Sequence, residues 1–173
     1  LFHTELTLSP QKIIGFWGSG AIIFMLGVVD DIKGLNARQK LVVQIPAALM
    51  LAFSGFLIDT SKLPFIGSFI GLGLTIIWLV GITNAMNLID GMDGLSSGVV
   101  IFASITLFIA SILGGKLLMA VISIALIGST LGFLWHNWHP AKIFMGDCGA
   151  MFLGFLLAAV SIETSYKSTT ANA

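Results

Sequence analysis

Long apolar stretches separated by short polar breaks run along the chain from residue 13 to residue 162. Most are close to the roughly 20 residues that a helix needs to cross about 30 Å of hydrocarbon, and the last is shorter. Only helices and closed barrels satisfy the backbone inside lipid, and these stretches lack the alternation of barrel strands, so they predict transmembrane helices. The expected segments are 13–29, 41–58, 65–83, 95–113, 117–135 and 148–162.

The polar breaks fall on alternating sides of the membrane when the crossings are counted. The breaks after the first, third and fifth segments share one side and hold most of the aspartates, whereas Asp59 is expected on the opposite side. Carboxylates beside membrane spans are costly and usually mark a functional site, so the acidic side is expected to carry an active site. Its acidic and amide residues are Asp30, Asp31, Asn84, Asn87, Asp90, Asp93 and Asp147.

Composition supports the same class. Hydrophobic residues make up 57% of the 173 residues and charged residues 9%, with a mean hydropathy of +1.03. Soluble domains average about 25% charged residues, so the chain is predicted to be an all-α, polytopic membrane protein of about six transmembrane helices. The formal net charge of zero argues against a nucleic-acid partner. Cys148 is the single cysteine, which excludes an internal disulfide.

The residue types on the acidic side indicate phosphoryl transfer. Asp and Asn oxygens are hard ligands suited to Mg²⁺ or Mn²⁺, and Mg²⁺ completes its shell with water and substrate phosphates. Nearby Lys and Arg neutralise further phosphate charge. The glycines of Asp90-Gly-Met-Asp-Gly94 allow the backbone to approach a ligand closely. A membrane location suggests that one substrate is a lipid.

Three stretches carry a resemblance to a known family. They are Val29-Asp-Asp-Ile-Lys33, Asn84-Ala-Met-Asn-Leu-Ile-Asp-Gly-Met-Asp-Gly-Leu95 and Pro140-Ala-Lys-Ile-Phe-Met-Gly-Asp147. In order and form they resemble the motifs of the polyprenyl-phosphate N-acetylhexosamine-1-phosphate transferases, of glycosyltransferase family 4 type. The resemblance covers essentially the whole chain.

The resemblance implies a Mg²⁺-dependent enzyme of the bacterial plasma (inner) membrane, with its active site on the cytoplasmic face. Such enzymes transfer a sugar-1-phosphate from a UDP-sugar to a polyprenyl phosphate, here expected to be undecaprenyl phosphate, and release UMP. The motif forms look closer to the branch that uses UDP-N-acetylglucosamine than to the phospho-MurNAc-pentapeptide transferases of peptidoglycan synthesis. Relatives also suggest a homodimer.

The same resemblance assigns roles at the phosphates. Asp147 is expected to be the main Mg²⁺ ligand, with Mn²⁺ as the alternative ion, and Asn87 is expected to assist it. Asp30 and Asp31 are expected beside the polyprenyl phosphate, where one of them orients or deprotonates it. Lys40 matches a family lysine that contacts phosphate.

Four further residues are assigned to the rest of the site. Asp93 and Phe144 are expected to hold the uracil ring, the first by hydrogen bonding and the second by stacking. Asp90 is expected to shape the metal and diphosphate region as part of the catalytic set. Asn84 is expected to bind substrate.

The chain also departs from the family pattern. Family members have more helices, so residues 1–173 are expected to form a single transmembrane catalytic domain that lacks N- and C-terminal helices of the full-length family. The family's histidine-rich cytoplasmic loop has no counterpart, because His136 and His139 precede the third motif. Ala150 stands where many relatives have a serine.

Other interpretations of the pattern remain open. One alternative is a transporter or channel in which the acids line an ion path. Another is a non-catalytic remnant or truncated product that keeps the motifs and lacks the flanking helices. Asn84 and Asn87 also suit the cap of a following helix, because asparagine is a strong N-cap residue. His136 and His139, which lie beside tryptophans, also suit an interfacial aromatic belt.

Overall fold

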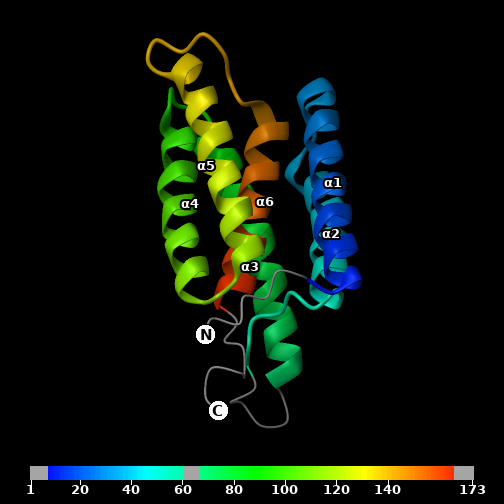
Figure 1. Ribbon diagram of the computed structural model, residues 1–173. Helices are drawn as coiled ribbons and strands as arrows, with labels where there is room; N and C mark the ends of the chain where they lie inside the picture. Colours follow the sequence, from blue (N-terminus) through cyan, green and yellow to red (C-terminus); the bar gives the residue numbers. More distant parts are fainter. Residues whose placement is uncertain (1–7, 61–66, 166–173) are drawn as a thin grey trace.

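The computed structural model describes residues 8–60 and 67–165, and within these ranges every regular element is an α-helix (Figure 1). Residues 65 and 66 of the third expected segment lie outside the described residues. The helices are α1 (Pro10–Lys33), α2 (Ala37–Phe53), α3 (Gly67–Ile89), α4 (Leu95–Leu113), α5 (Leu117–Asn137) and α6 (Gly146–Ser165).

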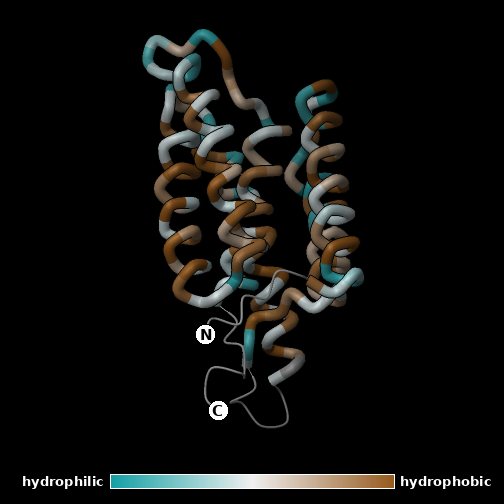
Figure 2. The backbone as a smooth tube through the Cα atoms, viewed as in Figure 1, coloured by the Kyte–Doolittle hydropathy of each residue, from teal (hydrophilic) through white to brown (hydrophobic). Residues whose placement is uncertain are grey.

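Five of the described helices are long and apolar enough to cross a membrane: α1, Phe69–Ile89 of α3, α4, α5 and α6. The hydropathy colouring shows apolar residues along these helices and polar residues gathered at the turns (Figure 2). The helix α2 is shorter, with 17 residues, and it carries Arg38 and Lys40 near its start and Pro46 inside. The prediction of an all-α, polytopic membrane protein is confirmed, with five helices instead of six that span by length and composition.

The first helix extends beyond the expected apolar segment. It runs to Lys33, so Asp30 and Asp31 lie in its last turn and not in a loop. It ends at Gly34, which adopts a left-handed conformation with φ of 65° and donates its N–H to the carbonyl of Asp30. The apolar pattern marks the lipid-facing length, whereas a glycine ends the helix.

The third helix likewise continues through polar residues to Ile89. Asn84 and Asn87 therefore lie within α3, and the cap position of α4 is taken by Gly94, which makes no side-chain cap. The interpretation of these asparagines as caps of the following helix is wrong. Placed three residues apart on one helix, they project from the same side of α3.

Six helix ends meet at one end of the bundle, which is the upper end in Figure 1. We call it the motif end, and it comprises residues 30–40, 84–97 and 137–148. The ends of α1, α3 and α5 and the starts of α2, α4 and α6 lie there. This arrangement agrees with the alternation of crossings expected from the sequence.

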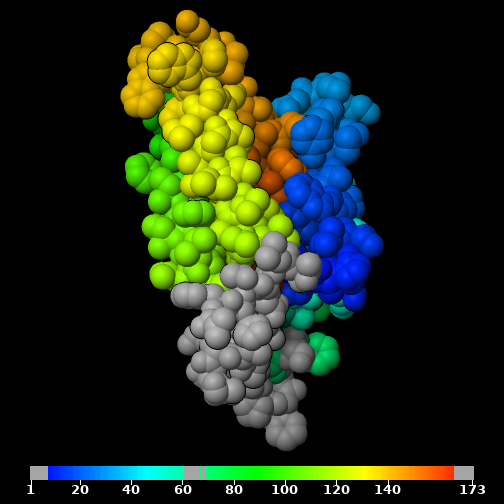
Figure 3. Space-filling model, viewed as in Figure 1, coloured from blue at the N-terminus to red at the C-terminus, as the bar shows by residue number. Residues whose placement is uncertain are grey.

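The central helix is α6, which packs against α1, α3 and α4 and is buried over most of its length. In the space-filling view its atoms show only as a strip between α5 and α1 (Figure 3). Glycines permit close approaches of α6 to α1 and to α3. A Cβ on Gly27 of α1 would lie 2.3 Å from the Cα of Cys148, and one on Gly154 would lie 3.0 Å from the Ile82 carbonyl oxygen of α3.

An ion-paired carboxylate lies at the other end of the bundle. Glu163 of α6 is 3% exposed, and its oxygens lie 2.8 Å from the Lys12 ammonium and 3.6 Å from the Lys116 ammonium. A buried carboxylate is tolerated only when it is paired, and here its two partners come from α1 and from the residue before α5. These two ion pairs join α6 to α1 and to the start of α5, away from the motif end.

Candidate active site

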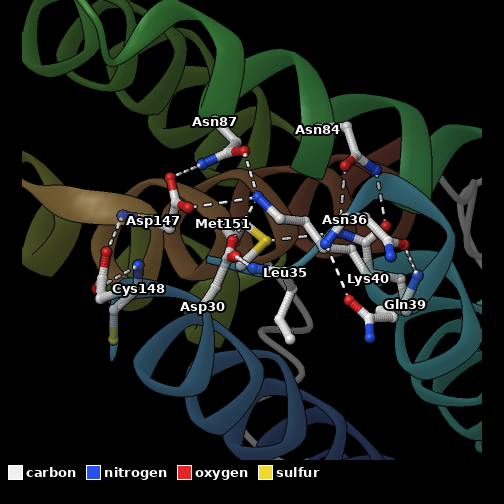
Figure 4. A network of polar contacts seen from close by, with 12 residues as sticks. Asp30, Leu35, Asn36, Gln39, Lys40, Asn84, Asn87, Asp147, Cys148 and Met151 are labelled. Atoms are coloured by element: carbon white, nitrogen blue, oxygen red, sulfur yellow. Dashed lines mark hydrogen bonds and ion pairs between the residues drawn. The ribbon is translucent and has the colours of Figure 1, made fainter. Parts of the chain in front are cut away.

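The ammonium group of Lys40 is the centre of a polar cluster at the motif end (Figure 4). It forms an ion pair with Asp30, lies 3.3 Å from Oδ2 of Asp147 and donates a 3.3 Å hydrogen bond to Oδ1 of Asn87. Each of these four residues comes from a different helix, namely α1, α2, α3 and α6. We call them the Lys40 cluster.

The turn between α1 and α2 places Lys40 in this cluster. Asn36 caps α2 by accepting a 3.0 Å hydrogen bond from the Gln39 N–H, while Gln39 Oε1 accepts from the Asn36 N–H. This reciprocal capping box fixes the first turn of α2. The N–H of Leu35 donates a 2.7 Å hydrogen bond to Oδ1 of Asp30, which ties the turn to α1.

The two carboxylates of the Lys40 cluster differ in their access to solvent. The Asp30 side chain is 1% exposed, whereas the Asp147 side chain is 37% exposed. Asn87 donates a 2.5 Å hydrogen bond from Nδ2 to Oδ1 of Asp147 and so orients that carboxylate. Asp147 is therefore the carboxylate of the cluster that a charged ligand reaches from solvent.

Asp31 points to the start of α6. Its two oxygens accept hydrogen bonds from the backbone N–H of Asp147, at 2.8 Å, and of Cys148, at 3.1 Å. The first N–H groups of a helix have no intrahelical partner, and the helix dipole favours a negative charge there. Asp31 thus stabilises the start of α6, and its expected role beside a lipid phosphate stays a prediction.

Asp90 follows α3 and approaches the same helix start. Its Oδ1 accepts a 2.5 Å hydrogen bond from the Ser96 hydroxyl. Burial raises the pKa of Asp90 above its ordinary value, and the negative charges of Asp147 and Asp31 add to this increase. Hydrogen bonds from Ser96 and from the backbone of Gly146 act in the opposite direction.

Asp93 links the second and third motifs at the surface. Its Oδ2 accepts hydrogen bonds from Nδ1 of His139, at 2.9 Å, and from the N–H of Ala141, at 3.1 Å. These contacts, chiefly the one from Ala141, hold the pKa of Asp93 below its ordinary value. Phe144, on the same loop as Ala141, is 67% exposed, so its ring is open to stacking.

Among the described residues, no hydrogen bond or ion pair joins Asp93 or Phe144 to the Lys40 cluster. The structure thus arranges the expected residues in two groups, the Lys40 cluster and the pair Asp93 and Phe144. Asp31 and Asp90 lie beside the start of α6. Asn84 is half-buried, and its amide bonds to Gln44 and to the carbonyl of Val80. Its expected contact with substrate stays a prediction.

Sequence reasoning missed Asn137, which joins the loops of the motif end. This residue is buried at the end of α5. Its Oδ1 accepts from the N–H of Gly94, at 3.0 Å, and from the Ser97 hydroxyl, at 3.1 Å, while Nδ2 donates to the carbonyl of Ile143 at 2.9 Å. A lone asparagine at the end of an apolar helix gives no signal of this role. His139 is a second residue whose role was missed, because the sequence suggested an aromatic belt and the structure shows a contact with Asp93.

The donors at the cluster fit a magnesium ion. The part of the chain that the structure describes has no group of three His, Cys, Asp or Glu side chains arranged for a metal. Magnesium, however, binds through one or two carboxylates and completes its shell with water and substrate phosphates. The accessible carboxylate of Asp147 is of this kind, and the amide oxygen of Asn87, which accepts from Lys40, is a second hard oxygen ligand beside it.

Comparison with known proteins gives the family. The model of glycosyl transferase family 4 matches residues 13–165. The chain is 44% identical, over 97% of its length, to the "Probable undecaprenyl-phosphate N-acetylglucosaminyl 1-phosphate transferase" of Bacillus subtilis (strain 168), and it covers 47% of that protein. It is 40% identical, over 83% of its length, to the decaprenyl-phosphate N-acetylglucosaminephosphotransferase of Mycobacterium tuberculosis (strain H37Rv), of which it covers 39%.

A third relative comes from the other branch. The chain is 35% identical, over 98% of its length, to the phospho-N-acetylmuramoyl-pentapeptide-transferase of Streptococcus pyogenes (serotype M5), of which it covers 54%. The chain thus spans about half the length of the curated relatives it matches. From the match to the family model over residues 13–165, the chain belongs to glycosyl transferase family 4.

Proposed function

We propose that the full-length protein transfers N-acetylglucosamine-1-phosphate from UDP-N-acetylglucosamine to undecaprenyl phosphate and releases UMP. This reaction is a first membrane step of cell-envelope glycan synthesis. The names of the Bacillus and Mycobacterium relatives support the sugar phosphate and the prenyl acceptor. The single observation that carries the proposal is the Lys40 cluster, in which four helices bring a cation, two carboxylates and an amide together at the motif end.

In this reaction the residues of the Lys40 cluster hold the phosphates. The Lys40 ammonium neutralises phosphate charge, and the buried Asp30 acts on the acceptor phosphate through its ion pair with that ammonium. Asp147 and Asn87 would hold a Mg²⁺ ion, which would supply charge stabilisation on the transferred phosphate. A lipid phosphate is already an anionic nucleophile near neutral pH, so it needs positioning more than activation, and we favour its direct attack on the β-phosphorus.

The second group of residues binds the nucleotide. Oδ2 of Asp93 is held by His139 and Ala141, which leaves Oδ1 as an acceptor for the imide N–H of uracil. The exposed ring of Phe144 stacks on the base. Asp90, held by Ser96 beside the start of α6, shapes the diphosphate region. The enzyme works in the bacterial plasma membrane with the motif end on the cytoplasmic side, as a homodimer.

The peptidoglycan reaction is the second candidate. The Streptococcus relative supports it, because that protein is named a phospho-N-acetylmuramoyl-pentapeptide-transferase and the match covers 98% of this chain. Both reactions use the same phosphate chemistry and differ in the sugar of the donor.

A donor competition separates these candidates. The purified full-length protein is incubated with undecaprenyl phosphate, Mg²⁺ and either UDP-N-acetylglucosamine or UDP-MurNAc-pentapeptide, and lipid-linked product and UMP are measured. We expect product with the first donor only. Product with the second donor alone assigns the protein to the peptidoglycan branch, and the absence of product with both, from folded protein, contradicts the proposal.

A further inference from the structure

A second layer of side chains, made of two amides and one thioether, lies beneath the Lys40 cluster. Each member of this layer is three or four residues away from a member of the cluster on the same helix, and thus on the same helix face one turn deeper in the bundle. Asn84 and Met151 are seen beside the cluster in Figure 4. The pairs of upper and lower residues are Lys40 and Gln44 on α2, Asn87 and Asn84 on α3, and Asp147 and Met151 on α6.

The centre of the lower layer is a reciprocal amide pair. Asn84 donates a 2.7 Å hydrogen bond from Nδ2 to Oε1 of Gln44, and Gln44 donates a 3.3 Å hydrogen bond from Nε2 to Oδ1 of Asn84. The Nε2 of Gln44 also lies 3.5 Å from the sulfur of Met151 on α6. Gln44 is 1% exposed, so its amide is directed wholly at these neighbours and contacts no solvent. Buried amides are retained when such partners satisfy them.

The amide pair is one of two polar links between α2 and α3. Within residues 8–60 and 67–165, the side-chain hydrogen bonds that join these helices are Lys40 to Asn87 and the Gln44–Asn84 pair. The two links are separated by one helical turn. Removal of the lower link therefore leaves the hydrogen bond from Lys40 to Asn87 as the remaining side-chain hydrogen bond between these two helices in the described residues.

We propose that Gln44 is a positioning residue of the active site: its pair with Asn84 sets the register of α2 against α3 and thereby holds Lys40 beside Asn87 and Asp147. Gln44 acts through Lys40 and touches no substrate. The inference rests on the proposed function where turnover is measured. A displacement of about 1 Å in a catalytic group reduces rates by on the order of 10²-fold, so a small shift of α2 along α3 is expected to reduce turnover.

Turnover provides one test. Gln44→Met keeps the length of the side chain and removes the amide, and we expect kcat to fall about tenfold or more while KM for the UDP-sugar changes little. The exchange of Gln44→Asn with Asn84→Gln retains both amides and the combined side-chain length, so it is expected to recover kcat relative to either single substitution. Thr75→Val, which alters an equally buried polar residue far from the motif end, is the control and is expected to retain kcat.

An unchanged kcat per folded molecule in Gln44→Met, together with a lower Tm, would show a purely structural residue and overturn the proposal. Failure of the Asn–Gln exchange to improve on both single variants also counts against it. These comparisons are relative to the wild-type enzyme, so the absence of lipid-linked product in the wild type contradicts the proposed function and not the role of Gln44.

A double-mutant cycle tests the coupling of Gln44 to Lys40 without turnover. Tm is measured for Gln44→Met, Lys40→Met and the double variant, since residues of one network show non-additive effects. We expect the double variant to lose less Tm than the two single losses combined. Additive losses overturn the proposal. If Gln44→Met fails to fold, Gln44→Asn takes its place in the cycle, with the same two outcomes.

Discussion

The carboxylate of Asp31 accepts a hydrogen bond of 2.8 Å from the backbone N–H of Asp147. Although the two residues are 116 positions apart, this contact joins the end of α1 directly to the start of α6. The neighbouring Asp30 contacts the Lys40 ammonium, which in turn contacts the side chain of Asp147. Asp31 thus binds the backbone of Asp147, while Asp30 binds Lys40, which contacts the side chain of Asp147.

Substitution of Asp31 tests the backbone contact. Asp31→Ala removes both acceptors at the start of α6, and we expect a loss of about 1 kcal/mol in stability, the usual effect of removing a helix cap, together with reduced turnover. Asp31→Asn keeps one acceptor and is expected to retain more of both. Urea unfolding in detergent and kcat are the measurements. Equal stability of Asp31→Ala and the wild type would show that the capping contact is unimportant.

Substitution of Asp147 tests the exposed carboxylate of the Lys40 cluster. Asp147→Asn removes one negative charge, and we expect turnover to fall at least on the order of 10²-fold with the fold intact, since charge stabilisation at the phosphates is lost. Asp59→Asn makes the same chemical change outside the motif end and is the matched control for turnover. Substantial activity of Asp147→Asn at ordinary Mg²⁺ concentrations would rule out Asp147 as the main ligand.

The pKa of Asp93 gives a prediction for pH. Because contacts with Ala141 and His139 lower this pKa in the folded state, ionised Asp93 stabilises the fold above its unfolded pKa of about 3.9, and this contribution is lost as the pH falls through the lower folded value. The Tm difference between the wild type and Asp93→Asn is therefore expected to persist from about pH 8 to pH 5 and to shrink below about pH 4. A difference that disappears between about pH 8 and pH 6 would contradict this assignment.

Labelling tests the shared location of the three motifs. Cysteines are placed at the exposed positions Lys33, Met92 and Lys142 at the motif end and Leu113 at the opposite end, in a background without Cys148. We expect an impermeant thiol reagent to reach the first three from the cytoplasmic side and Leu113 from the other side. Labelling of Lys33 and Met92 from opposite sides would exclude a common active site.

Much of this arrangement follows from sequence, because it depends on patterns that persist along a helix. Apolar length predicted the helices, and the alternation of crossings predicted that Asp30, Asn87 and Asp147 share one end. The ends of helices were less predictable. Both α1 and α3 continue past their apolar segments, since polar residues at a membrane surface are compatible with helix until a breaker such as Gly34 ends it.

The supporting residues could not be predicted, for a different physical reason. Gln44 falls inside the apolar segment 41–58, and its proposed role depends on which face of α2 meets α3. The sequence of a helix with apolar residues on all sides does not reveal that face. Asn137 and His139 likewise gain their roles from loops distant in sequence. Asp30 and Asp31 are adjacent acids, and such a pattern does not indicate which one contacts the start of another helix.

The fate of the β-phosphate tests the central claim most directly. The full-length protein is incubated with undecaprenyl phosphate, Mg²⁺ and UDP-N-acetylglucosamine carrying ³²P in the β-phosphate alone, with Asp147→Asn as the inactive control. Transfer of the sugar with its phosphate predicts that the label appears in the lipid fraction and that the nucleotide product is unlabelled UMP. Label retained in UDP while the sugar reaches the lipid, or the same lipid labelling with Asp147→Asn, would contradict the account.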